Sequence, residues 1–91
     1  MTITSQMSDE QLVEAFQAGH LAACAELVSG WQSKIRGAVW RVLGSTEDAA
    51  DITQEAFLRA FRGLKAFKRE AKFSSWIYQI ALNLCRDSLR R

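Results

Sequence analysis

The sequence contains no proline, and only five of its 91 residues are glycine. These two residues mark the frequent turns of all-β folds, so their scarcity favours long helices over short strands. A chain of this length has room for one hydrophobic core and therefore for one domain. The sequence predicts an all-α fold, a compact bundle of about four helices that spans residues 1–91.

The residues needed for most catalytic and metal sites are also scarce. His20 is the only histidine and has no set of ligands beside it, while Cys24 and Cys85 stand far apart without a CxxC motif. We therefore expect two core thiols rather than a disulfide or a metal site. The acidic stretch 47–55 has no histidine or cysteine next to it, and no glycine-rich phosphate loop occurs. An enzyme, a metal and a cofactor are not expected.

Long apolar runs are missing too. The longest uncharged run, Phe73–Cys85, has thirteen residues, whereas a helix that spans a bilayer needs about 20 apolar residues. The first basic residue is Lys34, so the positively charged start of a secretory signal is absent. These observations predict a cytoplasmic protein.

Charge is present but unevenly distributed. Residues 1–55 carry three basic and eight acidic side chains, and residues 56–91 carry nine basic and two acidic ones. A strongly basic half often has an anionic partner, for which nucleic acid is the first candidate. The simpler alternative is a basic helix face that is merely solvated.

Two helices are predicted in the first half. Ser8 and Gln11 have the spacing of a capping box, and Gly19 is expected to end the helix that follows. A second helix should run from about 20 to 43, with Gly30 and Gly37 as candidates for close helix packing. Its predicted buried stripe comprises Leu21, Cys24, Leu27, Val28, Trp31, Ile35, Ala38, Val39 and Val42.

A third helix should begin after Ser45 or Thr46, with acidic residues in its first turn. Its predicted inner half comprises Ala49, Ile52, Ala56, Phe57, Ala60, Phe61 and Leu64. Leu58 falls on the opposite, charged half. A lone exposed leucine is ordinary on a surface, but one surrounded by charges also fits the centre of a docking site.

The stretch KAFKREAKFSSWIY, residues 65–78, alternates cations with aromatic rings. Residues 65–75 break the helical pattern and predict a loop, after which Ser74 or Ser75 should cap a fourth helix. Ile77, Ile80, Ala81, Leu84 and Cys85 are expected to face inward. The other side would carry Gln79, Asn83, Arg86 and Arg90, with Trp76 at its edge. Exposed rings, amides and arginines suit a nucleic-acid surface; the alternative is a solvated helix with a core tryptophan.

Two linked stretches resemble a known family. DAADITQEAFLRAF (48–61) and LKAFKREAKFSSWIYQIALNLCRDSLRR (64–91) are similar to region 2 of bacterial sigma factors, in particular the extracytoplasmic-function group. The resemblance implies that the third helix docks on the β′ clamp coiled coil of core RNA polymerase. It further implies that the loop and the last helix melt the promoter −10 element and hold its single-stranded non-template strand.

The resemblance assigns residues to these two roles. Polymerase binding falls on Asp48, Asp51, Gln54, Glu55, Leu58, Arg59 and Arg62. DNA binding falls on Lys65, Lys68, Arg69, Lys72, Phe73, Ser74, Trp76, Tyr78, Gln79, Asn83 and Arg86. General physical principles agree, because rings can stack on unpaired bases while cations hold phosphates. An anti-sigma factor is a further partner that the family implies.

Three residues depart from the family pattern. Ala50 replaces a usual acid, Arg69 stands where glycine is frequent, and Leu82 replaces a residue that is often basic. The chain ends directly after the second stretch, so we expect the C-terminal −35-binding domain to be absent from it. A helical protein–protein adaptor and a helix-turn-helix reader of duplex DNA remain as competing interpretations.

Overall fold

A computed structural model describes residues 2–68 and 70–90, and four helices account for most of that part of the chain. They are α1 (Asp9–Gln17), α2 (Ala22–Leu43), α3 (Thr46–Leu64) and α4 (Phe73–Leu89). The predicted all-α fold of four helices is confirmed.

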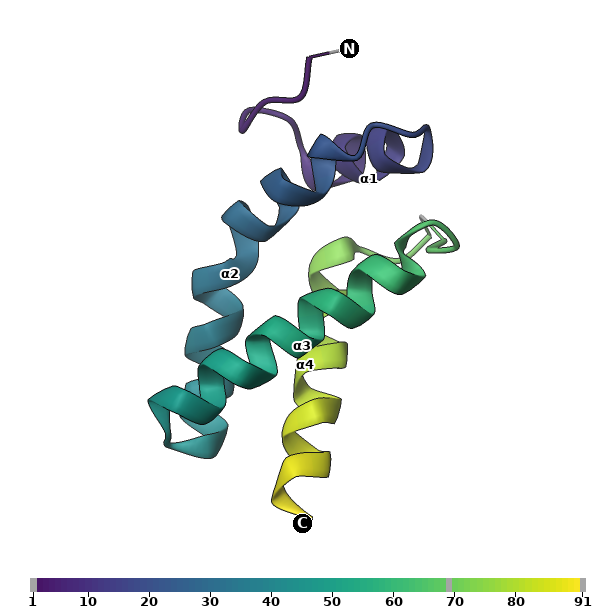
Figure 1. Cartoon of the computed structure of the whole chain (residues 1–91). Helices are drawn as coiled ribbons and strands as arrows, with labels where there is room; N and C mark the ends of the chain where they lie inside the picture. Colours follow the sequence, from purple (N-terminus) through teal and green to yellow (C-terminus); the bar gives the residue numbers. More distant parts are fainter. Residues whose placement is uncertain (1, 69, 91) are drawn as a thin grey trace.

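The helices form an elongated body of 43 × 22 × 17 Å. Helix α3 packs against both α2 and α4, and α1 packs against α2 near the start of that helix (Figure 1). The connection between α3 and α4 lies at the same end of the molecule as α1, while the chain ends at the opposite end of α4 (Figure 1). Residues far apart in the sequence are thereby brought together around this connection.

Local sequence signals set most helix ends. The Ser8 hydroxyl accepts from the Gln11 N–H at 3.1 Å, and the Gln11 side chain accepts from the Ser8 N–H at 2.8 Å. This reciprocal pair is the predicted capping box. Ser45 caps α3 by accepting from the Asp48 N–H at 3.2 Å. Gly44 ends α2 with a φ of 70°, a left-handed conformation that glycine adopts readily.

A single hydrophobic core lies between the helices. Leu27 and Ile35 of α2, Leu64 of α3 and Ile77 of α4 are fully buried in it. Thr53 is a buried polar residue whose hydroxyl donates to the Ala49 carbonyl at 2.6 Å, so its polar group is satisfied inside its own helix. The predicted inward faces of α3 and α4 are therefore largely confirmed, although Ile52, Phe61 and Ile80 are only half-buried.

Two expectations for α2 are wrong, namely the burial of both its end residues and close packing at its glycines. Leu21 is 70% exposed and Val42 is 44% exposed, because both lie at an end of the long helix rather than over the core. The helix runs from Ala22 to Leu43, close to the expected range of about 20 to 43. A Cβ atom added at Gly30 or Gly37 would meet nothing within 4 Å, so neither glycine marks close packing.

The predicted cap of α4 is also wrong. The helix begins at Phe73, its N-cap is Lys72, and no side chain caps it. Phe73 is only 3% exposed. Burying such a ring is worth about 1.5–3 kcal/mol, more than the ~1 kcal/mol of a serine cap. The helix therefore begins where the ring can be buried, ahead of both serines.

Candidate nucleic-acid and polymerase-binding surfaces

The residues assigned to polymerase binding form one continuous surface, here called the outer face of α3. Its members are Asp48, Asp51, Gln54, Glu55, Leu58, Arg59 and Arg62. All are exposed except Glu55, which is half-buried. Leu58 is 41% exposed, as its position among charges predicted. Glu55 and Arg59 form an ion pair at 3.3 Å, of a surface type that contributes little stability. These side chains are thus available to a partner.

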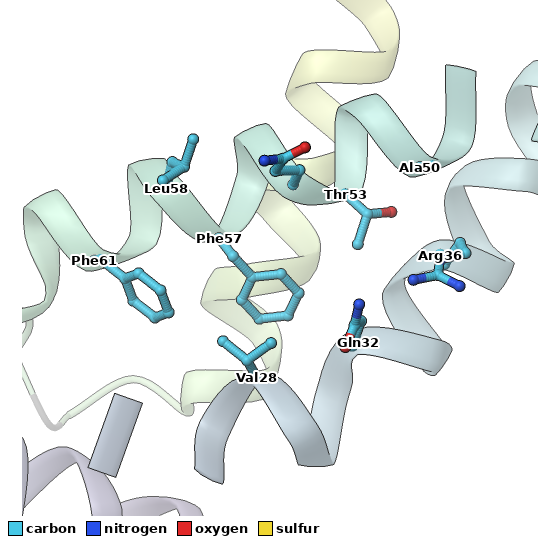
Figure 2. Close-up of a pocket in the computed structure, with 9 residues that line it drawn as sticks. Val28, Gln32, Arg36, Ala50, Thr53, Phe57, Leu58 and Phe61 are labelled. Carbon is cyan, nitrogen blue, oxygen red and sulfur yellow. The ribbon is translucent and has the colours of Figure 1, made fainter. Parts of the chain in front are cut away.

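An open groove of about 410 Å³ runs beside the outer face, between α2 and α3. Figure 2 shows Phe57 and Phe61 of α3 directed toward Val28 of α2, while Leu58 points to the outside. Gln32 and Arg36 of α2 line the same groove. A groove with apolar walls and a polar rim resembles the centre of a protein interface.

The sequence interpretation missed the contribution of α2 to this groove. Val28, Gln32 and Arg36 recur every four residues, which places them on one helix face. That spacing was visible in the sequence. What the sequence did not reveal is that this face lies opposite Phe57 and Phe61.

The cations between α3 and α4 lie on the surface. Lys65, Lys68 and Lys72 are exposed, as predicted. Arg69, also assigned to DNA binding, lies outside the described residues. An open hollow of about 610 Å³ is lined by Gln17, Lys65, Phe67, Lys68 and Glu70. The loop thus combines exposed lysines with a shallow, open depression of the surface.

The aromatic rings of this segment do not project as the sequence suggested. The centroids of the Phe67 and Trp76 rings are 4.6 Å apart, and those of Phe73 and Trp76 are 6.1 Å apart. Trp76 is half-buried, and Phe73 has no face open to a base. The expectation of an exposed ring is wrong for Phe73, which packs against Trp76. Trp76 keeps part of its surface exposed, so its stacking on a base stays a prediction.

Tyr78 packs on the other side of the start of α4. It meets Trp31 of α2 edge to face at 6.0 Å and is half-buried. The Trp31 indole in turn donates to an Asp9 carboxylate oxygen at 3.0 Å. Tyr78 therefore helps to join α4 to α2 and α1, and only part of its surface faces solvent.

Polar residues of α4 form an exposed row. Gln79, Asn83 and Arg86 all lie at the surface. The Gln79 amide donates to Asn83 Oδ1 at 3.0 Å, and the Arg86 guanidinium donates to the same oxygen. With Oδ1 occupied by its helix neighbours, the Asn83 amide nitrogen is the group left to approach a ligand. Ser74, in the first turn of α4, is half-buried.

A further residue at this site was not anticipated. The Gln17 side chain, at the end of α1, donates to the carbonyl oxygens of Leu64 at 3.1 Å and of Phe67 at 2.9 Å. Gln17 is separated from these partners by 47 and 50 residues in the sequence. No sequence signal could have shown this contact, because it depends on α1 lying beside the end of α3.

Neither cysteine is freely exposed, since Cys24 is half-buried and Cys85 is buried. Burial raises the pKa of both the Cys24 and the Cys85 thiols, so each stays protonated at neutral pH. Among residues 2–68 and 70–90, no three histidine, cysteine or acidic side chains are grouped as metal ligands would be. No helix in the described part of the chain has the length and apolar character required to cross a membrane.

Comparison with known proteins gives consistent matches. The family model for sigma-70 region 2 matches residues 27–91. The RNA polymerase sigma-H factor of Pseudomonas aeruginosa is 39% identical over 85 residues, covering 93% of this chain and 44% of that protein. The ECF sigma-E factor of Haemophilus influenzae is 37% identical over 87 residues, covering 96% and 46%. The chain thus spans less than half the length of these curated relatives.

A solved structure supports the same assignment. The NMR structure of an engineered region 2 of sigmaE in complex with GTAAAA matches with a TM-score of 0.84 and 39% sequence identity. The match covers 96% of this chain and 90% of the other. The family model, the relatives and the shared four-helix fold agree: the chain belongs to the sigma-70 region 2 family, with sigma factors of the ECF group among its relatives.

Proposed function

We propose that this chain acts in transcription initiation as the part of a cytoplasmic sigma factor that binds core RNA polymerase and recognises the promoter −10 element. One observation carries the proposal: a single four-helix domain presents two separate surfaces of different chemistry. The outer face of α3 has an exposed leucine among charges. The connection to α4 and the polar row of that helix have exposed lysines and amides. Such a domain can join a protein to a nucleic acid without catalysing a reaction.

The outer face of α3 is the proposed contact with the β′ clamp coiled coil. Leu58 supplies an apolar anchor, and its charged neighbours supply the rim that sets orientation. The adjoining groove, with Phe57 and Phe61 in its wall, extends the apolar area available to a partner helix. A helix laid into such a groove is a common mode of recognition.

The loop and α4 form the proposed single-strand site. Lys65, Lys68 and Lys72 are placed to hold phosphates, a contact that releases counterions and depends on salt. The hollow beside Lys65 and Phe67 can receive a base that has left the duplex. Extruding a base costs a few kcal/mol, so its capture would favour the melted −10 element. The amide of Asn83 would then read a base edge by hydrogen bonding.

The packing of the aromatic rings in this segment limits their contact with DNA. Phe73 is excluded as a stacking surface by its burial. Trp76 and Phe67 are half-buried and lie against each other, so only part of each ring is left to contact a base. In this proposal the rings mainly give the loop a fixed shape, and lysines and amides make most of the DNA contacts.

Oligonucleotide binding tests the DNA half of the proposal. The relative of known structure was solved with GTAAAA, so a labelled GTAAAA hexamer is a suitable probe, with hexathymidylate and a duplex as comparisons. Fluorescence anisotropy should show tighter binding of the chain to GTAAAA than to either comparison. Preference for the duplex would favour a helix-turn-helix reader, and no binding to any oligonucleotide would favour a protein–protein adaptor.

We further propose that an anti-sigma factor covers one of these surfaces. A few apolar side chains usually dominate such an interface, and Leu58 is available for that purpose. Trp76, half-buried against other rings, offers less surface than its sequence position suggested. Affinity purification of the tagged chain from cells that produce it should recover a dedicated inhibitor besides polymerase. Recovery of polymerase alone would count against this partner.

A further inference from the structure

The end of α3 and the first residues of the loop are held from two sides. On one side, the Gln17 amide donates to the carbonyl oxygens of Leu64 and Phe67. On the other, the Phe67 ring lies against Trp76 of α4, with ring centroids 4.6 Å apart. The loop entry, defined here as residues 65–68, thus sits between α1 and α4.

The two carbonyls lie where α3 ends and the loop begins. The last carbonyl groups of a helix have no partner within the helix. Leu64 is the last residue of α3, and its carbonyl accepts from Gln17 and, in a tight turn, from the Phe67 N–H at 3.2 Å. Gln17 therefore stabilises both the end of the helix and the first turn of the loop.

The position of Gln17 is itself fixed by the chain. It is the last residue of α1, and the following turn has Gly19 at a φ of 106°. The His20 N–H donates back to the Ala15 carbonyl at 2.9 Å, which closes that turn. Gln17 is half-buried, and its amide reaches the loop from the last residue of α1. The contact of Gln17 with the two carbonyls is therefore set by the end of α1 and the turn that follows it.

Gln17 also lines the hollow that Lys65, Phe67 and Lys68 border. The residues matched by the family model begin at 27, so Gln17 lies before them. From these contacts we propose that Gln17 is a positioning residue of the single-strand site. It holds the loop entry in the shape that receives a base, and α1 is thereby part of the DNA-reading apparatus. This inference rests on the proposed DNA-binding function.

The physical reason is preorganisation. A loop that is already held in its bound shape loses less conformational freedom when the ligand arrives. Contacts of lysines with phosphates depend mainly on charge and tolerate a displaced loop. Capture of a particular base needs the hollow in its correct shape. Loss of the Gln17 amide should therefore reduce discrimination between oligonucleotides more than it reduces general affinity.

The test compares Gln17→Met with the unchanged chain. Methionine keeps the approximate length of the side chain but has no N–H donor. We expect the preference for GTAAAA over hexathymidylate, measured by anisotropy, to fall about threefold to tenfold, the equivalent of one or two lost hydrogen bonds. Gln6→Met makes the same chemical change at an exposed position ahead of α1, outside both proposed surfaces, and should leave the preference unchanged.

Gln17→Lys provides the rescue. The lysine ammonium can donate to both carbonyls, so this variant should recover the preference that Gln17→Met loses. The added positive charge strengthens binding to both oligonucleotides alike, so its effect cancels in the ratio of the two affinities. A purely structural role would lower affinity for both strands equally, and that result would overturn the inference.

The outcomes separate the inference from the proposed function. If the unchanged chain does not prefer GTAAAA, the proposed DNA-reading function fails. If it does prefer GTAAAA and Gln17→Met retains that preference, only the role of Gln17 fails. Thermal melting by circular dichroism shows whether the variants fold. If Gln17→Met does not fold, the test rests on Gln17→Lys. A folded lysine variant that lacks the preference for GTAAAA overturns the inference. A folded lysine variant that keeps the preference supports the need for a donor at this position.

Discussion

The outer face of α3 and the segment from Lys65 to Tyr78 both present charge to solvent, but their apolar residues behave in opposite ways. On α3, Leu58 stays outside at 41% exposure, surrounded by charged side chains. In the later segment, Phe73 is buried and Trp76 is half-buried against Phe67. One surface keeps its apolar centre accessible, whereas the other uses its rings as internal support.

The two surfaces differ because only Leu58 has its direction set by the helix period alone. The position of Leu58 is set by a continuous helix, whose 3.6-residue period fixes the direction of each side chain. The ring-bearing segment crosses from the loop into the first turns of α4, and Phe67 of the loop packs on Trp76 of the helix. The period of one helix cannot reveal a contact with a residue of the loop. There the rings turn toward whatever partner removes most apolar surface from water. A surface on a regular helix can thus be read from the sequence, and a surface at a junction cannot.

The largest effect is expected at Phe73. Phe73→Ala should lower the free energy of unfolding by about 3–5 kcal/mol, the usual loss for a core phenylalanine. Urea unfolding followed by circular dichroism measures it, with Lys72→Ala as the exposed control. If Phe73→Ala is as stable as the control and loses only DNA binding, the Phe73 ring is a stacking surface. The contrast between an accessible Leu58 and internal rings would then be wrong.

The next effect concerns the other surface. Leu58→Asp should leave the thermal unfolding temperature nearly unchanged, because the side chain is outside the core. Binding to core polymerase should weaken about thirtyfold or more, as expected for the anchor of an interface. Surface plasmon resonance with immobilised core enzyme measures the loss. Leu82→Asp, at a residue of α4 that is 38% exposed, is the matched control. An unfolded Leu58→Asp variant would place this leucine in the core.

A pair of variants separates base reading from charge. Asn83→Ala should cost about 1–3 kcal/mol for the preferred base only, as for other directly read bases. Lys68→Ala should weaken all single strands alike and reduce the salt slope by about one unit. Anisotropy titrations at several salt concentrations measure both. Equal weakening of matched and mismatched strands by Asn83→Ala would leave the polar row of α4 with no role in base choice.

A smaller effect tests how tightly the rings are held. A Cβ atom at Gly63 would lie 3.3 Å from Cζ2 of Trp76, which the Phe67 ring keeps from shifting. Gly37 has open space around it. Gly37→Ala should therefore stabilise the domain by about 0.5–1 kcal/mol through helix propensity. Gly63→Ala should stabilise the domain less than Gly37→Ala does, or destabilise it. Equal gains in urea unfolding would mean that Trp76 is free to move.

The smallest effect concerns the thiols. Burial raises the pKa of Cys24 and Cys85 above the ordinary value of 9.0. Because the folded state holds these protons more tightly than the unfolded state, their contribution is present below that pH and is lost as pH rises through the folded pKa. Stability should thus decline slightly in that range, less so in a Cys85→Ser variant. A thiol reagent should modify half-buried Cys24 before Cys85, which is 1% exposed on the inner side of α4. Faster modification of Cys85 than of Cys24 would show that the inner side of α4 is accessible to the reagent.

Much of the fold was determined by the sequence alone. The capping box at Ser8, the Ser45 cap and the left-handed Gly44 are short-range features, so neighbouring residues are enough to specify them. The exposure of Leu58 and of the lysines follows from helix periodicity and from the cost of burying charge.

The tertiary structure decided what depends on contacts between distant segments. It buried Phe73 and moved the start of α4 ahead of the serines. It placed Val28 opposite Phe57 to form the groove. It also brought Gln17 to carbonyls 47 and 50 residues away. In each case the side chain had several local options of similar energy, and only the packing of one helix against another selected among them.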